Sequence, residues 1–326
     1  MTDQNNQSFE LPVMQILREA YGFVFSVPQR VIIAALVPFG IYFILSTLIQ
    51  VVFLNASAVE FFQVAATFEE IDPNDEDLDL AIFADFFRAM FSFFGWTAVL
   101  AILAGIAGAS MAAAWHRTTL IGLDADRTGF GFFFGRSELS YFFRALVMVL
   151  ITVAALFGYS MVASLLFGVL SVVLAIPAGD PSAALGFTSI LLLVLLAIGG
   201  FLVWLFLWAK LIMCLPAAAL GIQKFGFGEA WTATDGHTGR LMMVYAGLMI
   251  PISALGFAIS WLLDTFLGTG GSDPTTLTEA QLNSTVFISV IPTFLITAFS
   301  TALIASGMSY TYYRLGQPPE WVEKVF

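Results

Sequence analysis

Histidine and cysteine are the side chains of this sequence best suited to bind a metal ion or to act in nucleophilic catalysis. The chain has three of them, His116, Cys214 and His237, and they lie far apart in the sequence. Brought together by folding, they could form a metal site or a cysteine–histidine pair. None has a partner at the short spacing of a metal-binding motif. We therefore interpret the histidines as membrane-surface anchors and Cys214 as a small buried apolar side chain, and we expect no metal site and no cofactor.

A serine nucleophile is the other catalytic candidate. Ser306-Gly307 supplies half of the motif of an intramembrane serine protease. Such an enzyme also needs a histidine at similar depth in another span, and neither histidine lies in the middle of a predicted span. We therefore expect no catalytic residue and no enzyme activity.

Three arginines are the candidate contact residues of the chain: Arg136, Arg144 and Arg240. They lie in aromatic-rich segments next to apolar spans. A guanidinium near an anionic leaflet can bind lipid phosphates, at about 1 kcal/mol per residue. These arginines therefore predict contacts with membrane lipids or with a membrane-protein partner. The alternative is that they only set the topology of the chain.

The amino-acid composition indicates that the chain is a membrane protein. The chain has 326 residues, of which 59% are hydrophobic and 11% charged, and its mean hydropathy is +0.91. Soluble domains are about 45–50% apolar and about 25% charged. A single cysteine excludes a disulfide scaffold, and 12 basic against 23 acidic residues argue against nucleic acid as a partner.

Six segments are apolar over the roughly 20 residues that a helix needs to cross a bilayer. Helices satisfy their backbone hydrogen bonds internally, so the sequence predicts an all-α bundle. The predicted spans are residues 31–54, 91–115, 145–176, 185–215, 241–263 and 285–310. We accordingly divide the chain into a cytoplasmic tail with an interfacial helix (1–30), a six-span membrane domain (31–314) and a cytoplasmic C-terminal tail (315–326).

The distribution of basic residues predicts the orientation. Lys and Arg cluster in the two tails and in the second and fourth loops, whereas the odd-numbered loops hold one basic residue, Arg88. Basic residues close to span ends mark the cytoplasmic side. Both termini are therefore predicted to be cytoplasmic.

The spans pair into three hairpins with similar flanks. An aromatic-rich, amphipathic segment precedes each hairpin, at residues 11–24, 130–143 and 225–239. Each hairpin ends in an aromatic and basic cluster followed by Ile121-Gly122, Leu220-Gly221 or Leu315-Gly316. This pattern is consistent with three pseudo-repeated hairpins. The general preference of membrane surfaces for aromatic and basic side chains would also produce it.

Small residues at four-residue spacing indicate which spans pack most closely. They lie in the second and sixth spans, at Ala101, Gly105, Ala109 and Ala113, and at Ala298, Ala302 and Ser306. Small side chains let helix backbones approach each other, so these two spans are predicted to form the packed centre.

Several motifs near the span ends resemble a known group of proteins. They are Ala114-Trp115-His116-Arg117, Phe134-Gly135-Arg136-Ser137-Glu138-Leu139, Leu215-Pro216-Ala217-Ala218-Ala219-Leu220-Gly221 and Glu229-Ala230-Trp231-Thr232. In these motifs the chain resembles uncharacterised bacterial six-helix inner-membrane proteins, which are similar to the membrane domain of some glycerophosphodiester phosphodiesterases. The catalytic domain of those enzymes is absent from this sequence. The resemblance implies a location in the bacterial inner (plasma) membrane.

The sequence predicts an integral membrane protein without enzyme activity that binds lipids or a membrane-protein partner. The alternative is a passive or facilitated transporter of an apolar or lipid-like substrate. Pro38, Pro251 and Pro292 should kink the first, fifth and sixth spans. The transporter hypothesis predicts a cavity between hairpins lined by these kinked spans. No ionisable side chain lies at the centre of a predicted span, which argues against an ion-coupled pump.

Overall fold

The chain folds into a bundle of long helices. The computed structural model describes residues 11–69, 80–122, 135–175, 181–267 and 278–316. Every regular element within these residues is helical, and six helical segments are long and apolar enough to cross a membrane. The predicted all-α fold with six spans is confirmed.

The spans extend beyond the predicted apolar segments. They are formed by α2 (Pro28–Ile49), α4 (Leu80–Ile121), α5 (Arg136–Ala175), α6 (Pro181–Leu211), α9 (Thr238–Leu267) and α10 (Glu279–Arg314). Helix α4 alone has 42 residues, a length of roughly 63 Å. The apolar core of a bilayer is about 30 Å thick, so α4 must project beyond it or tilt.

A π-helical turn lengthens the first span. After α2, residues Gln50–Leu54 form η1, and the helix continues as α3 (Asn55–Glu69). Asn55 donates a hydrogen bond to Asn283 of α10 over 2.7 Å, and the ring of Phe61 stacks on Phe93 of α4. These contacts hold α3 against α4 and α10.

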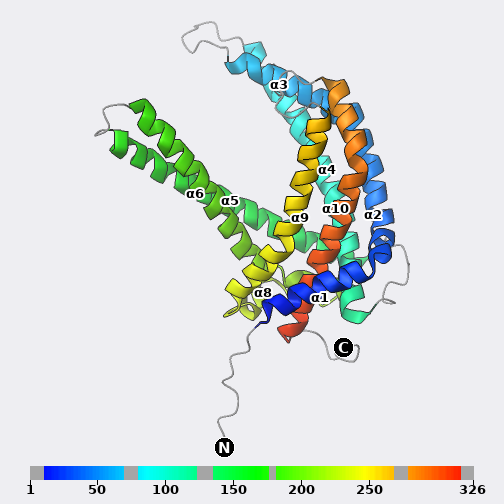
Figure 1. Cartoon of the computed structure of the whole chain (residues 1–326). Coiled ribbons are helices and arrows are strands. Elements are labelled where there is room, and N and C mark those ends of the chain that lie inside the picture. The colour runs from blue at the N-terminus through cyan, green and yellow to red at the C-terminus, as the bar shows by residue number, and fades with distance from the viewer. Residues whose placement is uncertain (1–10, 70–79, 123–134, 176–180, 268–277, 317–326) are drawn as a thin grey trace, which may run out of the picture.

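Short helices gather at one end of the bundle, which we call the base. Helices α1 (Val13–Ser26), α7 (Cys214–Ala219) and α8 (Phe227–Ala233) lie there, together with the end of α10 (Figure 1). Helix α1 forms over most of the predicted interfacial segment 11–24, and the hydroxyl of Tyr21 donates to the Gly247 carbonyl of α9. The predicted second interfacial segment is different: from Arg136 onward it is the first part of α5 itself, and residues 130–134 lie outside the described residues.

Helices α5 and α6 form a hairpin that leaves the rest of the bundle. Above the base it diverges from α4, α9 and α10 (Figure 1). We call residues 150–175 of α5 and 181–203 of α6 the arm. Within it, Tyr159 donates a hydrogen bond to the Leu195 carbonyl over 2.8 Å, beside Gly199. Large apolar side chains such as Phe157 and Leu165 are exposed on the arm, as expected for a surface that faces lipid.

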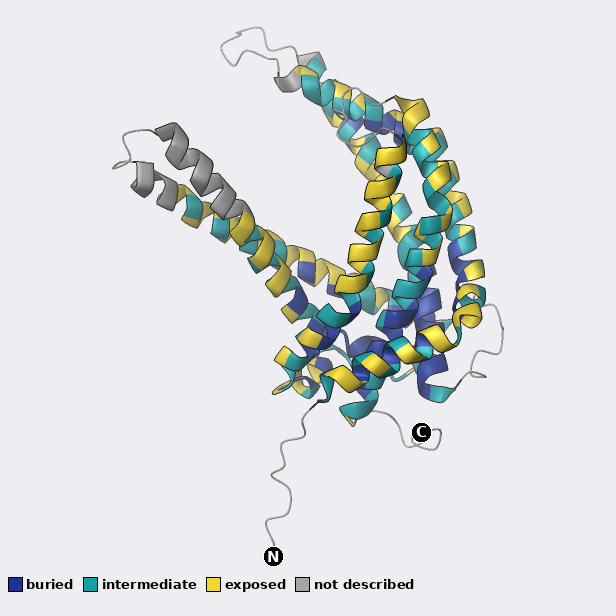
Figure 2. Ribbon diagram, in the orientation of Figure 1, coloured by how far each residue is buried: buried dark blue, intermediate teal, exposed yellow. Residues whose placement is uncertain are grey.

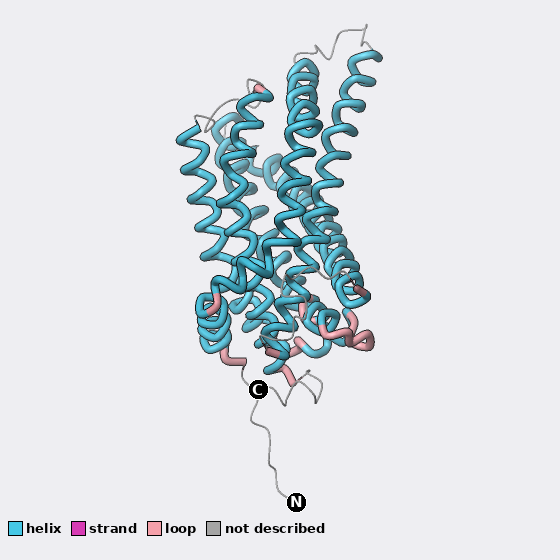
Figure 3. The backbone as a smooth tube through the Cα atoms, turned by 90° about the vertical axis from the view of Figure 1, so that its right-hand side faces the viewer, coloured by secondary structure: helices cyan, strands magenta, loops and turns pink. Residues whose placement is uncertain are grey.

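Buried side chains are concentrated at the base, whereas the parts of the spans farther from the base have mostly exposed or half-buried residues (Figure 2). Trp115, Tyr245 and Tyr312 are among the largest fully buried residues. The long helices rise together from this end when the molecule is viewed from the side (Figure 3). The base is thus packed like the core of a soluble protein.

The threefold pattern is present in the helix ends and in the order in which the hairpins pack. Gly122, Gly221 and Gly316, one after each hairpin, all have positive φ angles, the conformation in which glycine commonly ends a helix. Helices α4 and α10 pack directly against each other, as the small residues predict, whereas α6 packs against α5 and α9. The second helix of each hairpin also packs against the first helix of the next, α4 on α5, α6 on α9 and α10 on α2. The three hairpins therefore share a terminating turn and a cyclic order of contacts, from which the direct α4–α10 contact departs.

Candidate functional site

A cavity of about 250 Å³ lies where the arm leaves the bundle, between α4, α5, α6 and α10. We call it the vertex cavity. Gly105, Gly108, Ala109 and Ala112 form its α4 wall. A Cβ atom added at Gly108 would meet no atom within 4 Å. The stripe of small residues thus does more than pack helices, because it also leaves room for a ligand.

The cavity lies at the junction of buried and exposed surface. Met308 and Ala109 in its lining are buried, whereas Val149 of α5 is 43% exposed. Val149 lies at the root of the arm, where α5 begins to diverge from α4. A hydrocarbon chain could therefore reach the cavity from the bilayer.

Polar side chains line the cavity toward the base. His116 Nδ1 lies 2.8 Å from Ser309 Oγ, and its Nε2 lies 3.4 Å from the Tyr141 hydroxyl. Trp208 also lines the cavity, and its indole Nε1 is buried without a hydrogen-bond partner among the described residues. Thr301 of α10 adds a hydroxyl group farther from the base. The cavity thus combines apolar walls with a few hydrogen-bonding groups, most of them toward the base, which is the usual composition of a small-molecule site.

Hydrogen bonds between α4 and α10 support this polar end. Trp115 Nε1 donates to Ser306 Oγ over 2.7 Å, and Thr119 Oγ1 lies 3.4 Å from the same hydroxyl. Ser306 and Ser309 are both fully buried. Ser306 is therefore used to join two helices, a role that its small side chain permits.

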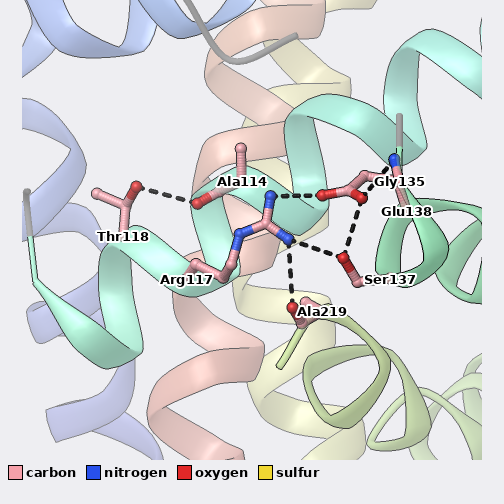
Figure 4. A network of polar contacts seen from close by, with 7 residues as sticks. All are labelled: Ala114, Arg117, Thr118, Gly135, Ser137, Glu138 and Ala219. Atoms are coloured by element: carbon pink, nitrogen blue, oxygen red, sulfur yellow. Dashed lines mark hydrogen bonds and ion pairs between the residues drawn. The ribbon is translucent and has the colours of Figure 1, made fainter. Parts of the chain in front are cut away.

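A buried ion pair joins α4 to the first turn of α5 (Figure 4). Arg117 Nη2 lies 2.6 Å from Glu138 Oε1, and Nη1 donates to the Ala219 carbonyl at the end of α7. Glu138 Oε2 accepts from the Gly135 backbone N–H and from the Ser137 hydroxyl, both over 2.9 Å. We call these contacts the base joint. Glu138 thus caps the N-terminus of α5 and neutralises Arg117.

Arg144 forms a second internal connection. Its guanidinium donates to four backbone carbonyls in or after α7, those of Cys214, Ile222, Gln223 and Phe225, over 2.6–3.4 Å. Cys214 is the first residue of α7, and the other three carbonyls belong to the segment between α7 and α8. The contacts of Arg117 and Arg144 therefore join the end of α4, the first part of α5 and α7 at the base.

The three predicted contact arginines have different surroundings. Arg144 is occupied by the carbonyls just described, whereas Arg136 lies exposed in the first turn of α5. Arg240 is half-buried near the start of α9 and interacts with other groups of the protein. The structure does not bring the three arginines into one site, and contact with lipid or partner stays a prediction.

The predicted metal and nucleophile candidates do not form a metal site within the described residues. His116 is buried in α4, Cys214 is buried at the start of α7, and His237 lies in the turn before α9. Across the described parts of the chain, no group of three or more His, Cys, Asp and Glu residues could hold a metal ion. Cys214 is buried as predicted, but His116 lies inside the base core and is not a surface anchor.

A second cavity, of about 430 Å³, lies between α1, α9 and α10. Its lining is apolar and includes Phe25, Leu255, Pro292 and Phe299. It provides no side-chain hydrogen-bonding group and therefore cannot orient a ligand by polar contacts. The vertex cavity is for this reason the better candidate site.

No protein-family model matches the chain, and neither curated proteins nor solved structures show significant similarity to it. The argument for function therefore depends on the geometry of the vertex cavity. Sequence reasoning did not assign Trp208 or Tyr141 to a binding site. In the sequence, each of these two residues is only an aromatic side chain near the cytoplasmic end of a predicted span. The same pattern is expected for an ordinary membrane-surface anchor, so it does not indicate a binding site.

Proposed function

We propose that this integral membrane protein binds a lipid or a lipid-like amphiphile in the vertex cavity, without catalysing a reaction on it. The observation that carries the proposal is the combination, in one cavity, of small and apolar walls with a polar end formed by His116, Tyr141 and Trp208. A narrow cavity of this kind suits a hydrocarbon chain better than a folded protein partner.

The proposal includes a location and an orientation. The base holds nearly all the described Lys and Arg residues, including Arg18, Arg117, Lys210 and Arg314, whereas Arg88 lies toward the other end. Basic residues favour the cytoplasmic side. We therefore place the base, with both ends of the chain, in the cytoplasm at a bacterial inner membrane, in keeping with the family resemblance.

The transporter alternative has weaker support. It requires a cavity between hairpins lined by the kinked spans. Two of these, α9 and α10, line the second cavity but belong to the same hairpin, and only α10 lines the vertex cavity. Below the cavity the base is closely packed around Trp115, Met213 and Tyr312. A binding site that is closed toward the base fits this geometry better than a continuous path does.

Native mass spectrometry of protein extracted gently from its membrane tests the proposal. Wild-type protein should retain lipid at a defined stoichiometry, and Gly108→Leu should lose it because the leucine side chain fills the cavity. Gly158→Leu is the matched control, since a Cβ at Gly158 of the arm likewise meets nothing within 4 Å. Equal lipid content in the three proteins would contradict the proposal, provided that all three unfold at similar temperatures.

A further inference from the structure

We infer that the ligand of the vertex cavity is a neutral amphiphile, with a carbonyl or hydroxyl group that accepts a hydrogen bond from Trp208 and with an apolar chain that lies along α4. This inference depends on the proposed function and specifies the chemical class of its ligand.

The charges around the cavity exclude a strongly anionic head group. None of the side chains that line the cavity is that of Lys, Arg, Asp or Glu. The basic side chains next to lining residues are committed elsewhere: Arg144 binds four backbone carbonyls, Lys210 pairs with Asp235, and Arg117 pairs with Glu138. A phosphate or carboxylate in the cavity would be buried without a counter-charge, which is strongly unfavourable.

The hydrogen-bonding groups indicate what the head group must offer. The indole N–H of Trp208 is buried and has no acceptor within the described chain. A buried donor without a partner costs free energy, which a ligand acceptor would recover. The Tyr141 hydroxyl has only a long contact of 3.4 Å to His116 Nε2, so it can also turn toward a ligand.

The length of the cavity fits a chain with its head toward the base. Along α4 the lining runs from Gly105 to His116, a distance of roughly 16 Å at the helical rise per residue. His116 and Tyr141 lie at the base end, whereas Gly105 lies farther along the span. The head group is therefore placed among the polar residues, and the chain extends toward the opening between α5 and the bundle.

Lipid binding by the purified protein in phosphatidylcholine nanodiscs tests the inference. Two probes are added at equal mole fraction: diacylglycerol, which is neutral, and phosphatidylglycerol, which is anionic. We expect wild-type protein to retain diacylglycerol preferentially in native mass spectrometry. Trp208→Phe should weaken that binding roughly five-fold, the value of one neutral hydrogen bond. Trp204→Phe, one helical turn away on α6 and outside the cavity lining, should leave binding unchanged.

The outcomes separate this inference from the proposed function. Preferential retention of phosphatidylglycerol, displaced by Gly108→Leu, would overturn the neutral head group and leave the lipid-binding proposal intact. Equal binding by wild type and Trp208→Phe would overturn the role of the indole N–H. Retention of neither probe, together with the absence of co-purified lipid, would overturn both.

Discussion

The carboxylate of Glu138 is fully buried. Arg117 neutralises its charge, and the Gly135 backbone N–H at the start of α5 donates a hydrogen bond to it. Removing one member of a buried ion pair leaves the other charge uncompensated and costs about 3–5 kcal/mol. We expect Glu138→Ala to lower the stability of the folded protein by this amount, measured by thermal unfolding in detergent.

An exposed ion pair of the same chain provides the control. Arg88 lies 3.8 Å from Glu60, and the two side chains are 72% and 48% exposed. Such pairs contribute about 0–1 kcal/mol. Glu60→Gln should therefore leave the unfolding temperature almost unchanged. Equal losses in the two variants would show that the base joint is not a buried ion pair.

Cys214 permits a test of burial at the base by chemical labelling. Burial raises the pKa of the Cys214 thiol to about 12, so at pH 7–8 almost none of it is the reactive thiolate. Because Cys214 is the only cysteine in the chain, mass spectrometry can follow its modification by maleimide directly. We expect no labelling in the folded protein and complete labelling in SDS; rapid labelling without denaturant would contradict the packed base.

At the scale of single residues, the sequence predicts which side chains are basic but not what they contact. Arg144 reads as a membrane-surface arginine, yet it binds the carbonyls after α7. Its partners are backbone atoms some 70–80 positions away, which no local spacing reveals. The vertex cavity is equally hidden, since Gly105 and Gly108 show the same pattern whether a neighbouring helix or a ligand fills the space beside them.

Among the elements, the arm depends on close contact between its two helices. An added Cβ at Gly199 would overlap the Tyr159 hydroxyl oxygen, whereas at Gly200 the nearest atom is 3.8 Å away. Gly199→Ala should therefore displace Tyr159 from the Leu195 carbonyl and destabilise the hairpin by about 1–3 kcal/mol. Gly200→Ala should be neutral or stabilising by up to about 1 kcal/mol, because alanine favours helix.

Thermal unfolding of both glycine variants measures this difference, and hydrogen exchange at residues 194–203 localises it. Faster exchange only in Gly199→Ala is the expected result. Similar behaviour of the two variants would mean that Tyr159 does not hold the arm together.

For the elements, hydropathy predicts the six spans because the bilayer sets their length and apolar character. It does not predict that α5 and α6 diverge from the bundle. Side chains that face lipid and side chains that face another helix are equally apolar, so Phe157 and Leu165 resemble buried residues in sequence. The packed α4–α10 pair is predicted because small residues distinguish close helix contacts from lipid contacts.

The whole molecule has both ends of its described chain at the base, and its topology can be tested with single cysteines. Arg136 lies exposed near the base, whereas Glu60 of α3 lies exposed toward the opposite end. In bacterial cells that express the protein, a membrane-impermeant maleimide should label Glu60→Cys once the outer membrane is permeabilised. It should label Arg136→Cys only after the cells are lysed. Cys214 adds no background because it is buried. The reverse pattern would invert the proposed orientation.

The attachment of the arm has a mechanical consequence. Helix α5 has 40 residues and a length of roughly 60 Å, and the arm is joined to the remaining helices only near its root. The part of α5 that belongs to the arm, residues 150–175, is roughly 39 Å long and acts as a lever: each degree of rotation at the root moves its far end by about 0.7 Å. The vertex cavity lies at this root, and the base joint lies at the start of the same helix. A change of a few degrees there would therefore redistribute lateral pressure in the distal leaflet, far from any atom that a ligand touches.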